Sequence, residues 1–260
     1  MTRNRRVVVL SLSGLVLAAA ALAALVSAVS TVRGKGQQTE CQSRLRMLGL
    51  GLVQHATSRG YYPAAVVPND QLPLDRRLSW FFKTMQYIQS MPEWAVETEP
   101  WDSPGNRKWS TRDIWLFHCP SVSGDHPGGL TQFVGITGVG RDSPRLPREH
   151  PRAGVFGFDR SARFDELKDV ASTTLLIVET AERNGRWLSG GDPTVRPIDP
   201  ARRPHVGRGR PFGGLHRGGA NAVFADGSVR FIPDSVDPKV LEALGTVAGG
   251  EAVGPDVARW

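Results

Sequence analysis

Residues 7–32 read VVVLSLSGLVLAAAALAALVSAVSTV and contain no charged side chain. As an α-helix rising about 1.5 Å per residue, this segment would reach roughly 39 Å, which exceeds the roughly 30 Å hydrocarbon core of a bilayer. Only a helix can satisfy the backbone polar groups of such a segment within lipid. We therefore expect residues 7–32 to form a transmembrane helix.

The charges around this segment suggest an orientation. Three of the first six residues are arginines, and a positive N-terminal flank is held on the cytoplasmic side. Arg33 and Lys35 follow the segment, so the charge difference between its two ends is modest. We expect residues 1–6 to be a short cytoplasmic tail of a single-pass protein in the inner (cytoplasmic) membrane. The rest of the chain would then lie outside the cytoplasm, with membrane lipid as its first partner.

A cleaved secretion signal is the alternative for this N-terminus. The basic start would be its n-region, and Val26-Ser27-Ala28 resembles an A-x-A cleavage site. The apolar stretch is, however, longer than the roughly 7–15 residues of a normal signal core. Cys41 lies too far beyond the stretch to receive a lipid there. The sequence therefore favours an uncleaved anchor.

Helical periodicity continues beyond the apolar segment. Buried-type residues recur at spacings of three and four, which places them on one face of a helix; they are Cys41, Leu45, Leu48, Leu52 and His55. We expect residues 33–58 to extend the helix and to pack on a domain formed by residues 59–260. Gly34 and Gly36 each weaken a helix by up to about 1 kcal/mol, which predicts a break near them.

The remaining sequence indicates an α+β domain with long loops. The chain has 29 glycines and 19 prolines, which favours turns over a helical bundle. Residues 78–88 fit a short amphipathic helix that starts near Ser79. Strands are predicted for residues 113–119, 131–136 and 173–178, which alternate or are rich in β-branched side chains. The predicted architecture is a long helix packed on an antiparallel sheet.

Residues 221–232, NAVFADGSVRFI, give the sharpest local prediction. Asp226-Gly227 between two apolar runs indicates a hairpin with a type I′ turn, which requires positive φ at both central residues. In that register Phe224 faces Val229, and Ala222 lies on the same face of the ribbon. We expect this face to pack against the long helix, because an isolated hairpin is marginally stable.

The chain has two cysteines, Cys41 and Cys119. In an oxidising compartment they could form a disulfide that ties the helix to the 113–119 strand. Closing that loop of roughly 78 residues would contribute around 4 kcal/mol in the chain-entropy model. Two buried free thiols are the alternative, and the sequence leaves both open. Because the chain has no C-x-x-C pair, we expect no metal site.

Composition and motifs argue against most other function classes. The net charge is +7, but no basic run with interleaved aromatics is present, so a nucleic-acid partner is not expected. The arginine-rich segment 196–210 could touch anionic headgroups or a partner, although a solvated loop is the simpler interpretation. The sequence contains no G-x-S-x-G motif, phosphate loop or dinucleotide fingerprint. We expect neither a catalytic residue nor a cofactor.

A cluster of His205, His216 and Asp226 is the strongest catalytic or metal-binding alternative. Asp226 is better explained as a turn residue that tolerates positive φ, and His216 lies beside two glycines in a loop. Glu179 and Glu182 form a carboxylate pair that the sequence places at an exposed strand end. These residues therefore give no coherent catalytic set.

Several segments resemble one known family. Residues 216–227, from His216 to Asp226-Gly227, resemble the H-X9-DG signature of a large bacterial family of prepilin-like proteins of unknown function. Further segments match in chain order: residues 41–52 are similar to C-x-N-L-K-x-L-G-L-A-L, 77–87 to R-L-S-W, 117–120 to F-K-C-P, and 153–158 with 169–179 to G-x-F…D-G-x-S-N-T-L-x-V-x-E.

The resemblance implies a pilin or pseudopilin architecture, with this chain or other pilin-like proteins as partners. The sequence departs from the prepilin motif G-F-T-L-x-E, because Arg6 is followed by VVVLSLSG. It therefore lacks the glutamate that pilins are thought to use in subunit docking. Residues 169–174 also lack the Gly and Asn of the family pattern.

Three functional hypotheses follow. The first is a non-enzymatic, pseudopilin-like protein with a structural or assembly role in the cell envelope or in secretion. The second is a membrane-tethered ligand-binding module that does not polymerise, and the missing glutamate shifts weight toward it. An extracytoplasmic hydrolase is the third, and it has the least support.

Overall fold

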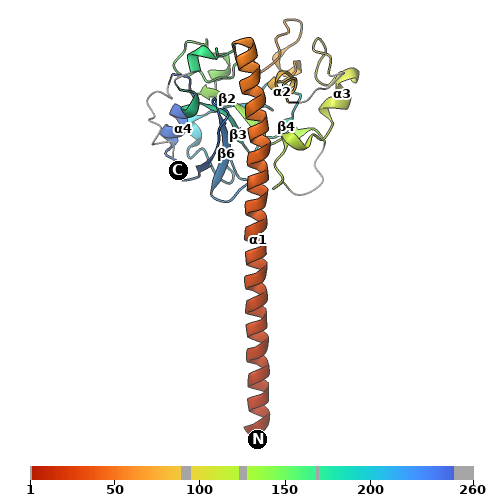
Figure 1. Cartoon of the computed structure of the whole chain (residues 1–260), viewed down its shortest axis with the longest axis vertical. Coiled ribbons are helices and arrows are strands. Elements are labelled where there is room, and N and C mark those ends of the chain that lie inside the picture. Colours follow the sequence, from red (N-terminus) through yellow and green to blue (C-terminus); the bar gives the residue numbers. More distant parts are fainter. Residues whose placement is uncertain (1, 89–94, 123–127, 168–169, 249–260) are drawn as a thin grey trace.

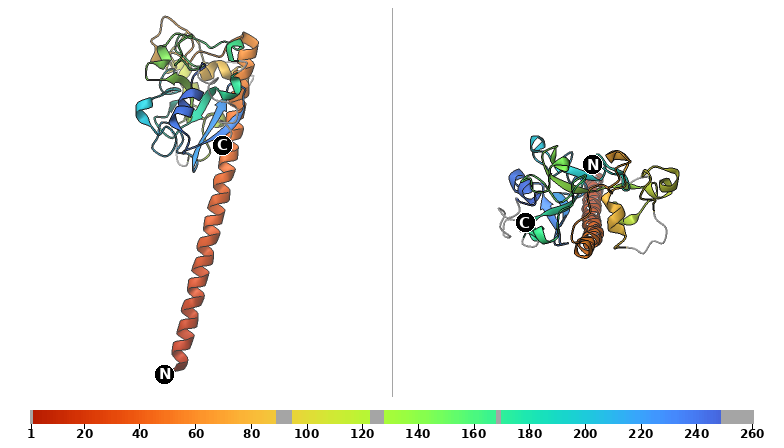
Figure 2. Two further views of the ribbon diagram at one scale, coloured as in Figure 1. Left: turned by 90° about the vertical axis from the view of Figure 1, so that its left-hand side faces the viewer. Right: turned by 90° about the horizontal axis from the view of Figure 1, so that it is seen from above.

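The computed structural model describes residues 2–88, 95–122, 128–167 and 170–248, with side chains from residue 15 onward. Helix α1 (Thr2–Arg59) is a rod whose C-terminal part lies along a globular body, while its N-terminal part projects away as a stem (Figure 1). A second view, turned by 90°, shows the same separation of stem and body (Figure 2). The expected α+β fold with a long N-terminal helix is confirmed.

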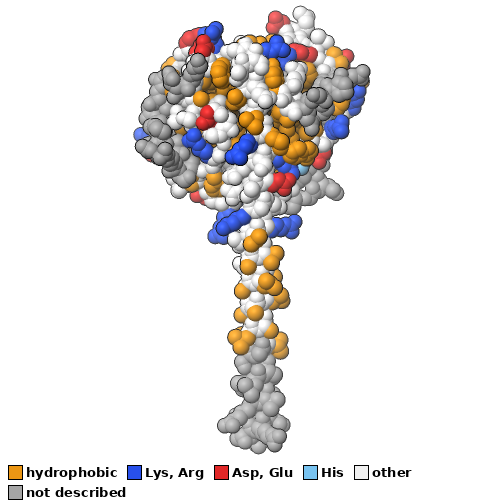
Figure 3. Space-filling model, viewed as in Figure 1, with side chains coloured by type: hydrophobic (Ala, Val, Ile, Leu, Met, Phe, Trp, Pro, Cys, Tyr) orange, Lys and Arg blue, Asp and Glu red, His pale blue; other side chains and the backbone are white. Residues whose placement is uncertain are grey.

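The stem carries apolar side chains that nothing in the body covers (Figure 3). Side chains of residues 15–36 are exposed, and α1 is long and apolar enough, by length and composition, to cross a membrane. The helix runs without interruption through Gly34 and Gly36, so the predicted break is wrong. A break would leave up to four N–H and four C=O groups without helical partners. The free-energy cost of these unpaired groups exceeds the cost of keeping two glycines in a helix, which is about 1 kcal/mol each.

The upper part of α1 is the spine of the body. Its predicted stripe is confirmed, because the side chains from Cys41 to Leu52 on that face are fully buried. Two glycines let the helix approach its neighbours closely. A Cβ at Gly49 would lie 2.7 Å from Cγ1 of Val223, and one at Gly51 would lie 2.6 Å from Cγ1 of Ile88. The small side chains therefore set how tightly α1 packs.

A five-stranded sheet lies at the centre of the body, in the order β5-β2-β3-β6-β7. Its neighbouring strands are antiparallel except for the parallel pair β2 and β5, so the sheet is mixed rather than purely antiparallel. The predicted strands 131–136 and 173–178 are confirmed as β2 and β3. The bounds are β2 (Phe133–Val139), β3 (Leu175–Glu179), β5 (Val195–Ile198), β6 (Gly219–Phe224) and β7 (Val229–Pro233).

Shorter elements surround this sheet. A small two-stranded sheet pairs β1 (Leu130–Thr131) with β4 (Gly185–Arg186). The predicted helix 78–88 is present in a shorter form as α2. The remaining elements are α2 (Trp80–Met85), α3 (Pro104–Ser110), α4 (Pro238–Leu244) and the 3₁₀ turns η1 (Leu74–Arg76), η2 (Trp115–Phe117), η3 (Ser143–Arg145), η4 (Asp165–Leu167), η5 (Ala171–Thr173) and η6 (Pro200–Arg202).

Both faces of the central sheet are covered, and this makes two hydrophobic cores. The face toward α1 and α2 packs with large aromatic residues such as Trp80, Phe117 and Trp187. The opposite face packs with Phe212 and with Leu241 of α4. Every residue of β6 is buried, as expected for a strand with two covered faces.

The hairpin of β6 and β7 has a different register from the predicted one. Val223 pairs with Val229, and Phe224 N donates to Ser228 O at 2.9 Å, which closes a loop of residues 225–227. Of the two residues Asp226 and Gly227, only Gly227 has positive φ. Phe224 O accepts from Gly227 N at 2.9 Å, which is a type I turn followed by a left-handed residue. The one-residue shift reverses the faces. Val223 therefore packs toward α1, while Ala222 and Phe224 pack in the opposite core.

The strand predicted for residues 113–119 is wrong, because this segment forms the turn η2. Its carbonyl groups bind side chains from elsewhere in the chain instead of a neighbouring strand. The buried guanidinium of Arg44 donates to the carbonyls of Trp115 and His118 at 2.6 and 2.8 Å. The carbonyl of Phe117 accepts from the Thr131 hydroxyl at 2.7 Å.

Candidate functional site

Four side chains from distant parts of the chain meet where α1 enters the body. We call them the Cys–Cys–Glu–His cluster: Cys41 of α1, Cys119 after η2, Glu179 at the end of β3, and His216 before β6. One sulfur, nitrogen or oxygen atom from each lies within 4.8 Å of the other three. All four side chains are buried, and the most exposed of them, His216, is 3% exposed.

The contacts within the cluster are close. Sγ of Cys41 lies 3.1 Å from Oε2 of Glu179, and Sγ of Cys119 lies 3.3 Å from Nε2 of His216. That nitrogen is 3.5 Å from Oε2 of Glu179. Both cysteines are free thiols whose sulfurs lie within 4.8 Å of one another, so a disulfide between them stays a prediction.

A second set of polar groups holds these side chains in place. Nδ2 of Asn221 donates to Oε2 of Glu179 at 3.0 Å, and Asn221 in turn accepts from Gln42 at 3.0 Å. Nδ1 of His216 lies 3.3 Å from the Ser121 hydroxyl. Because Ser121 occupies Nδ1, the other ring nitrogen of His216 is directed at the sulfur and carboxylate of the cluster.

Burial and mutual contact shift the pKa of all four groups. Burial raises the pKa of Glu179 to about 7. The hydrogen bond from the Cys41 thiol lowers the pKa of Cys119 to about 5, whereas the same bond and burial raise the pKa of Cys41. Burial disfavours the charged form of His216, but Cys119 and Glu179 outweigh it and raise the His216 pKa. The cluster thus favours an anionic sulfur on Cys119.

The structure separates the three residues of the histidine–aspartate alternative. His216 and Asp226 lie at opposite ends of β6, and Oδ1 of Asp226 accepts from Ser228 N at 2.8 Å as a turn residue. His205 instead contacts Glu242 of α4, with Nε2 2.9 Å from Oε1. Of these residues, only His216 belongs to the Cys–Cys–Glu–His cluster.

Glu179 is the member of the cluster that sequence reasoning placed wrongly. It was expected at an exposed strand end, but its side chain is fully buried because β3 lies in the centre of the sheet, between β2 and β6. A signal was present, since each cluster residue comes from a different segment of the family resemblance. Those segments are 41–52, 117–120, 169–179 and 216–227.

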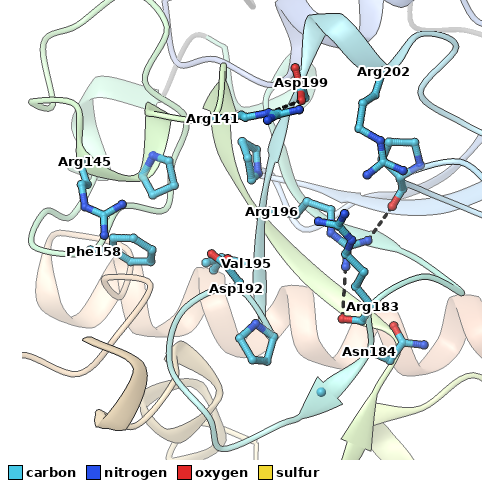
Figure 4. Close-up of a pocket in the computed structure, with 15 residues that line it drawn as sticks. Arg141, Arg145, Phe158, Arg183, Asn184, Asp192, Val195, Arg196, Asp199 and Arg202 are labelled. Atoms are coloured by element: carbon cyan, nitrogen blue, oxygen red, sulfur yellow. Dashed lines mark hydrogen bonds and ion pairs between the residues drawn. The ribbon is translucent and has the colours of Figure 1, made fainter. Parts of the chain in front are cut away.

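An arginine-lined pocket is the second candidate site (Figure 4). It has a volume of about 480 Å³ and is lined in part by β5. Its walls carry five arginines and two aspartates: Arg141, Arg145, Arg183, Arg196, Arg202, Asp192 and Asp199. Arg141 pairs with Asp199 at 2.7 Å. Among the residues that the structure describes, Arg183 and Arg202 form no ion pair, so the pocket keeps an excess of positive charge.

Arg196 has a structural role in this pocket. It was expected in a solvated loop, but it lies on β5, is buried, and donates to the carbonyls of Pro211 and Glu182 at 2.6 and 2.7 Å. Burial lowers its pKa to about 10. The guanidinium is therefore occupied by backbone acceptors, and the exposed arginines of the rim are the ones available to a ligand.

Together these features define an α+β domain built on a long helix whose N-terminal part is apolar and exposed. A buried thiol-containing cluster lies where this helix enters the domain. The sequence matches a family model described as a protein of unknown function (DUF1559) over residues 31–197 and 188–239, which is most of the chain. The chain belongs to this family, and the matched region includes all four residues of the cluster. Comparisons with curated proteins and with solved structures gave no match.

Proposed function

We propose that this protein is a single-pass, membrane-anchored, pilin-like protein with a non-enzymatic structural or assembly role in the cell envelope or in secretion. The observation that carries the proposal is the two-part surface of α1. Residues 15–36 are exposed and mostly apolar, while the face from Cys41 to Ala56 is buried in the body. One helix thus serves as both an anchor and the spine of a domain, which is the arrangement expected of a pilin-like subunit.

The exposed apolar residues of the stem support a lipid environment. Large side chains here are 59–71% exposed, and they are Leu15, Val16, Leu17, Leu22, Leu25, Val26, Val29 and Val32. Full burial of such a side chain contributes about 1.5–3 kcal/mol, so the stem gains much from transfer into a bilayer. A continuous apolar surface of this kind is rare on soluble monomers. The basic N-terminal tail favours an orientation with the body outside the cytoplasm.

Charged substitutions in the stem test the anchor. A double variant, Leu22→Arg with Leu25→Arg, places charges within the span, at about 2.5–3.5 kcal/mol each when centred in the bilayer. We expect the double variant to move from the carbonate-washed membrane fraction to the soluble fraction. Leu50→Arg is the matched control, because Leu50 is 51% exposed on the domain part of the same helix. A double variant that stays in the membrane fraction would contradict the anchor.

Chemical crosslinking in native membranes tests the assembly role. A pilin-like assembly places the stems of neighbouring subunits side by side, so crosslinks between stems are expected. Absence of any stem-to-stem crosslink would contradict the assembly role but not the proposed membrane anchor. In that case a tethered binding module would explain the protein better.

The arginine-lined pocket favours that second candidate function. A pocket with five arginines and two aspartates suits an anionic ligand, since a concave wall of one charge raises the local concentration of the opposite charge. Inorganic phosphate is a suitable probe. We expect Arg183→Ala with Arg202→Ala to weaken phosphate binding by full-length protein in detergent, measured by calorimetry. Arg230→Ala is the control, because Arg230 stacks on Phe224 outside this pocket.

A further inference from the structure

We propose that the Cys–Cys–Glu–His cluster binds one zinc(II) ion in a closed tetrahedral site. This inference does not depend on the membrane role, because all four residues lie in the body or on the part of α1 buried in it. The site would fasten α1 to the sheet at the point where the helix leaves the domain.

The chemistry of the four side chains fits zinc. Thiolate, imidazole and carboxylate groups are the ligands that zinc uses in proteins, and four protein ligands without an open position are typical of a structural site. Two sulfur ligands disfavour magnesium and calcium, which prefer oxygen ligands. The set therefore points to a thiophilic divalent ion with tetrahedral geometry.

The distances fit the same geometry. Tetrahedral zinc with bonds of about 2.0–2.3 Å places neighbouring ligand atoms roughly 3.3–3.8 Å apart. Of the six pairs of ligand atoms, three measure 3.1, 3.3 and 3.5 Å, and the other three lie within 4.8 Å. Only small side-chain adjustments would be needed to bring the four atoms to the vertices of one tetrahedron.

Outer contacts orient the ligands as metal sites require. Ser121 lies at Nδ1 of His216, which directs the other nitrogen to the cluster, and Asn221 donates to the carboxylate of Glu179. The amide of Cys119 donates to the side chain of Gln132 at 3.1 Å. Such partners fix the orientation of metal ligands and usually contribute to affinity.

The burial of Glu179 is a second, independent observation. Its side chain is fully buried, and Oε1 has no hydrogen-bond partner among the residues that the structure describes. A buried carboxylate oxygen without a partner is costly. A divalent cation beside the carboxylate would offset that cost. A Cys41–Cys119 disulfide would not, because it engages only the sulfurs and supplies no partner for Oε1 of Glu179.

The location gives the proposed ion a mechanical role and an entry route. Counted from residue 15, Cys41 is the first buried residue of α1, so a metal bond there holds the helix where the stem begins. A pocket of about 480 Å³, lined by α1 between Ser30 and Gln38 and by Ser121 and His216, reaches the cluster from outside. Together with Cys119, Glu179 and His216, the site would join four separate segments of the chain.

Metal analysis of the full-length protein tests the proposal. The protein is purified in detergent under reducing conditions, and its zinc content is measured by inductively coupled plasma mass spectrometry. We expect one zinc per chain. Replacement by cobalt(II) should give a sulfur-to-cobalt charge-transfer band and the intense visible bands of tetrahedral cobalt. A chelator should lower the melting temperature of the wild-type protein.

Variants separate metal binding from folding. Cys119→Ser and His216→Ala should lose the stoichiometric ion, and Ser121→Ala should weaken cobalt affinity by roughly 10–100-fold. His205→Ala is the control, because it removes a buried histidine outside the cluster and should retain one ion per chain.

The wild-type protein alone can overturn the proposal. A reduced chain without stoichiometric zinc and without a cobalt–sulfur band would do so, as would a native Cys41–Cys119 disulfide with no zinc.

Discussion

Gly227 shows how a single residue sets the register of the β6–β7 hairpin. Its φ is +79°, in the left-handed region that glycine occupies without the Cβ penalty. Asp226 does not share this conformation, although the Asp-Gly pair is the usual sequence of a turn with two left-handed residues. Instead, the amide of Asp226 donates to the carbonyl of Ala171 at 3.1 Å. This contact outside the hairpin accompanies the longer loop, and sequence alone could not reveal it.

Substitution of Gly227 tests this explanation. We expect Gly227→Ala to lower the free energy of unfolding by about 1–2 kcal/mol, because a Cβ is disfavoured at positive φ. Gly227→Asn should lose less, since asparagine tolerates the left-handed region better. Urea unfolding of the full-length protein in detergent measures both. Equal losses would mean that contact with Val53, whose Cγ2 lies 3.4 Å from the added Cβ, matters more than backbone strain.

Among the elements, α1 was the easiest to predict, because its signals are local. The apolar stretch and the stripe from Cys41 to His55 depend only on spacing along one helix. Strands β2 and β3 were found for the same reason, since β-branched runs indicate strands without knowledge of their neighbours. The segment 113–119 failed because Arg44, which binds its carbonyl groups, lies about 70 positions earlier in the chain. Long-range hydrogen bonds of this kind leave no periodic pattern in the sequence.

Two leucines on α1 provide a matched test of its buried face. Leu48 is fully buried, whereas Leu50, two positions later, is 51% exposed. We expect Leu48→Ala to cost about 2–5 kcal/mol through lost burial and the cavity that remains. Leu50→Ala should change stability by no more than about 0.5 kcal/mol. Denaturant unfolding monitored by tryptophan fluorescence can compare them. Similar losses for the two variants would mean that another subunit or lipid covers Leu50.

At the scale of the whole molecule, the four residues of the Cys–Cys–Glu–His cluster can be read from the sequence, but their proximity in the fold cannot be predicted from it. The sequence pairs Cys41 with Cys119 and places His216 in a motif, but it predicts a surface position for Glu179. The fold brings them together because α1 crosses the sheet beside the end of β3, and the chain returns through His216 into β6. Pairing of distant strands decides such a site, and register and topology are the properties that local pattern predicts least well.

The division between stem and body leads to a last prediction. Lys35 is exposed between the apolar stem and Cys41, where α1 enters the body. Because Lys35 is exposed and precedes the first buried residue of α1, we expect a lysine-specific protease added to the outer face of native membranes to cut there. The cut should release a soluble fragment that begins at Gly36, identified by its mass and N-terminal sequence. Lys35→Arg keeps the charge but removes the cleavage site, so it should keep the body in the membrane fraction. A body that stays with the membrane after cleavage at Lys35 would show that contacts other than α1 hold it there.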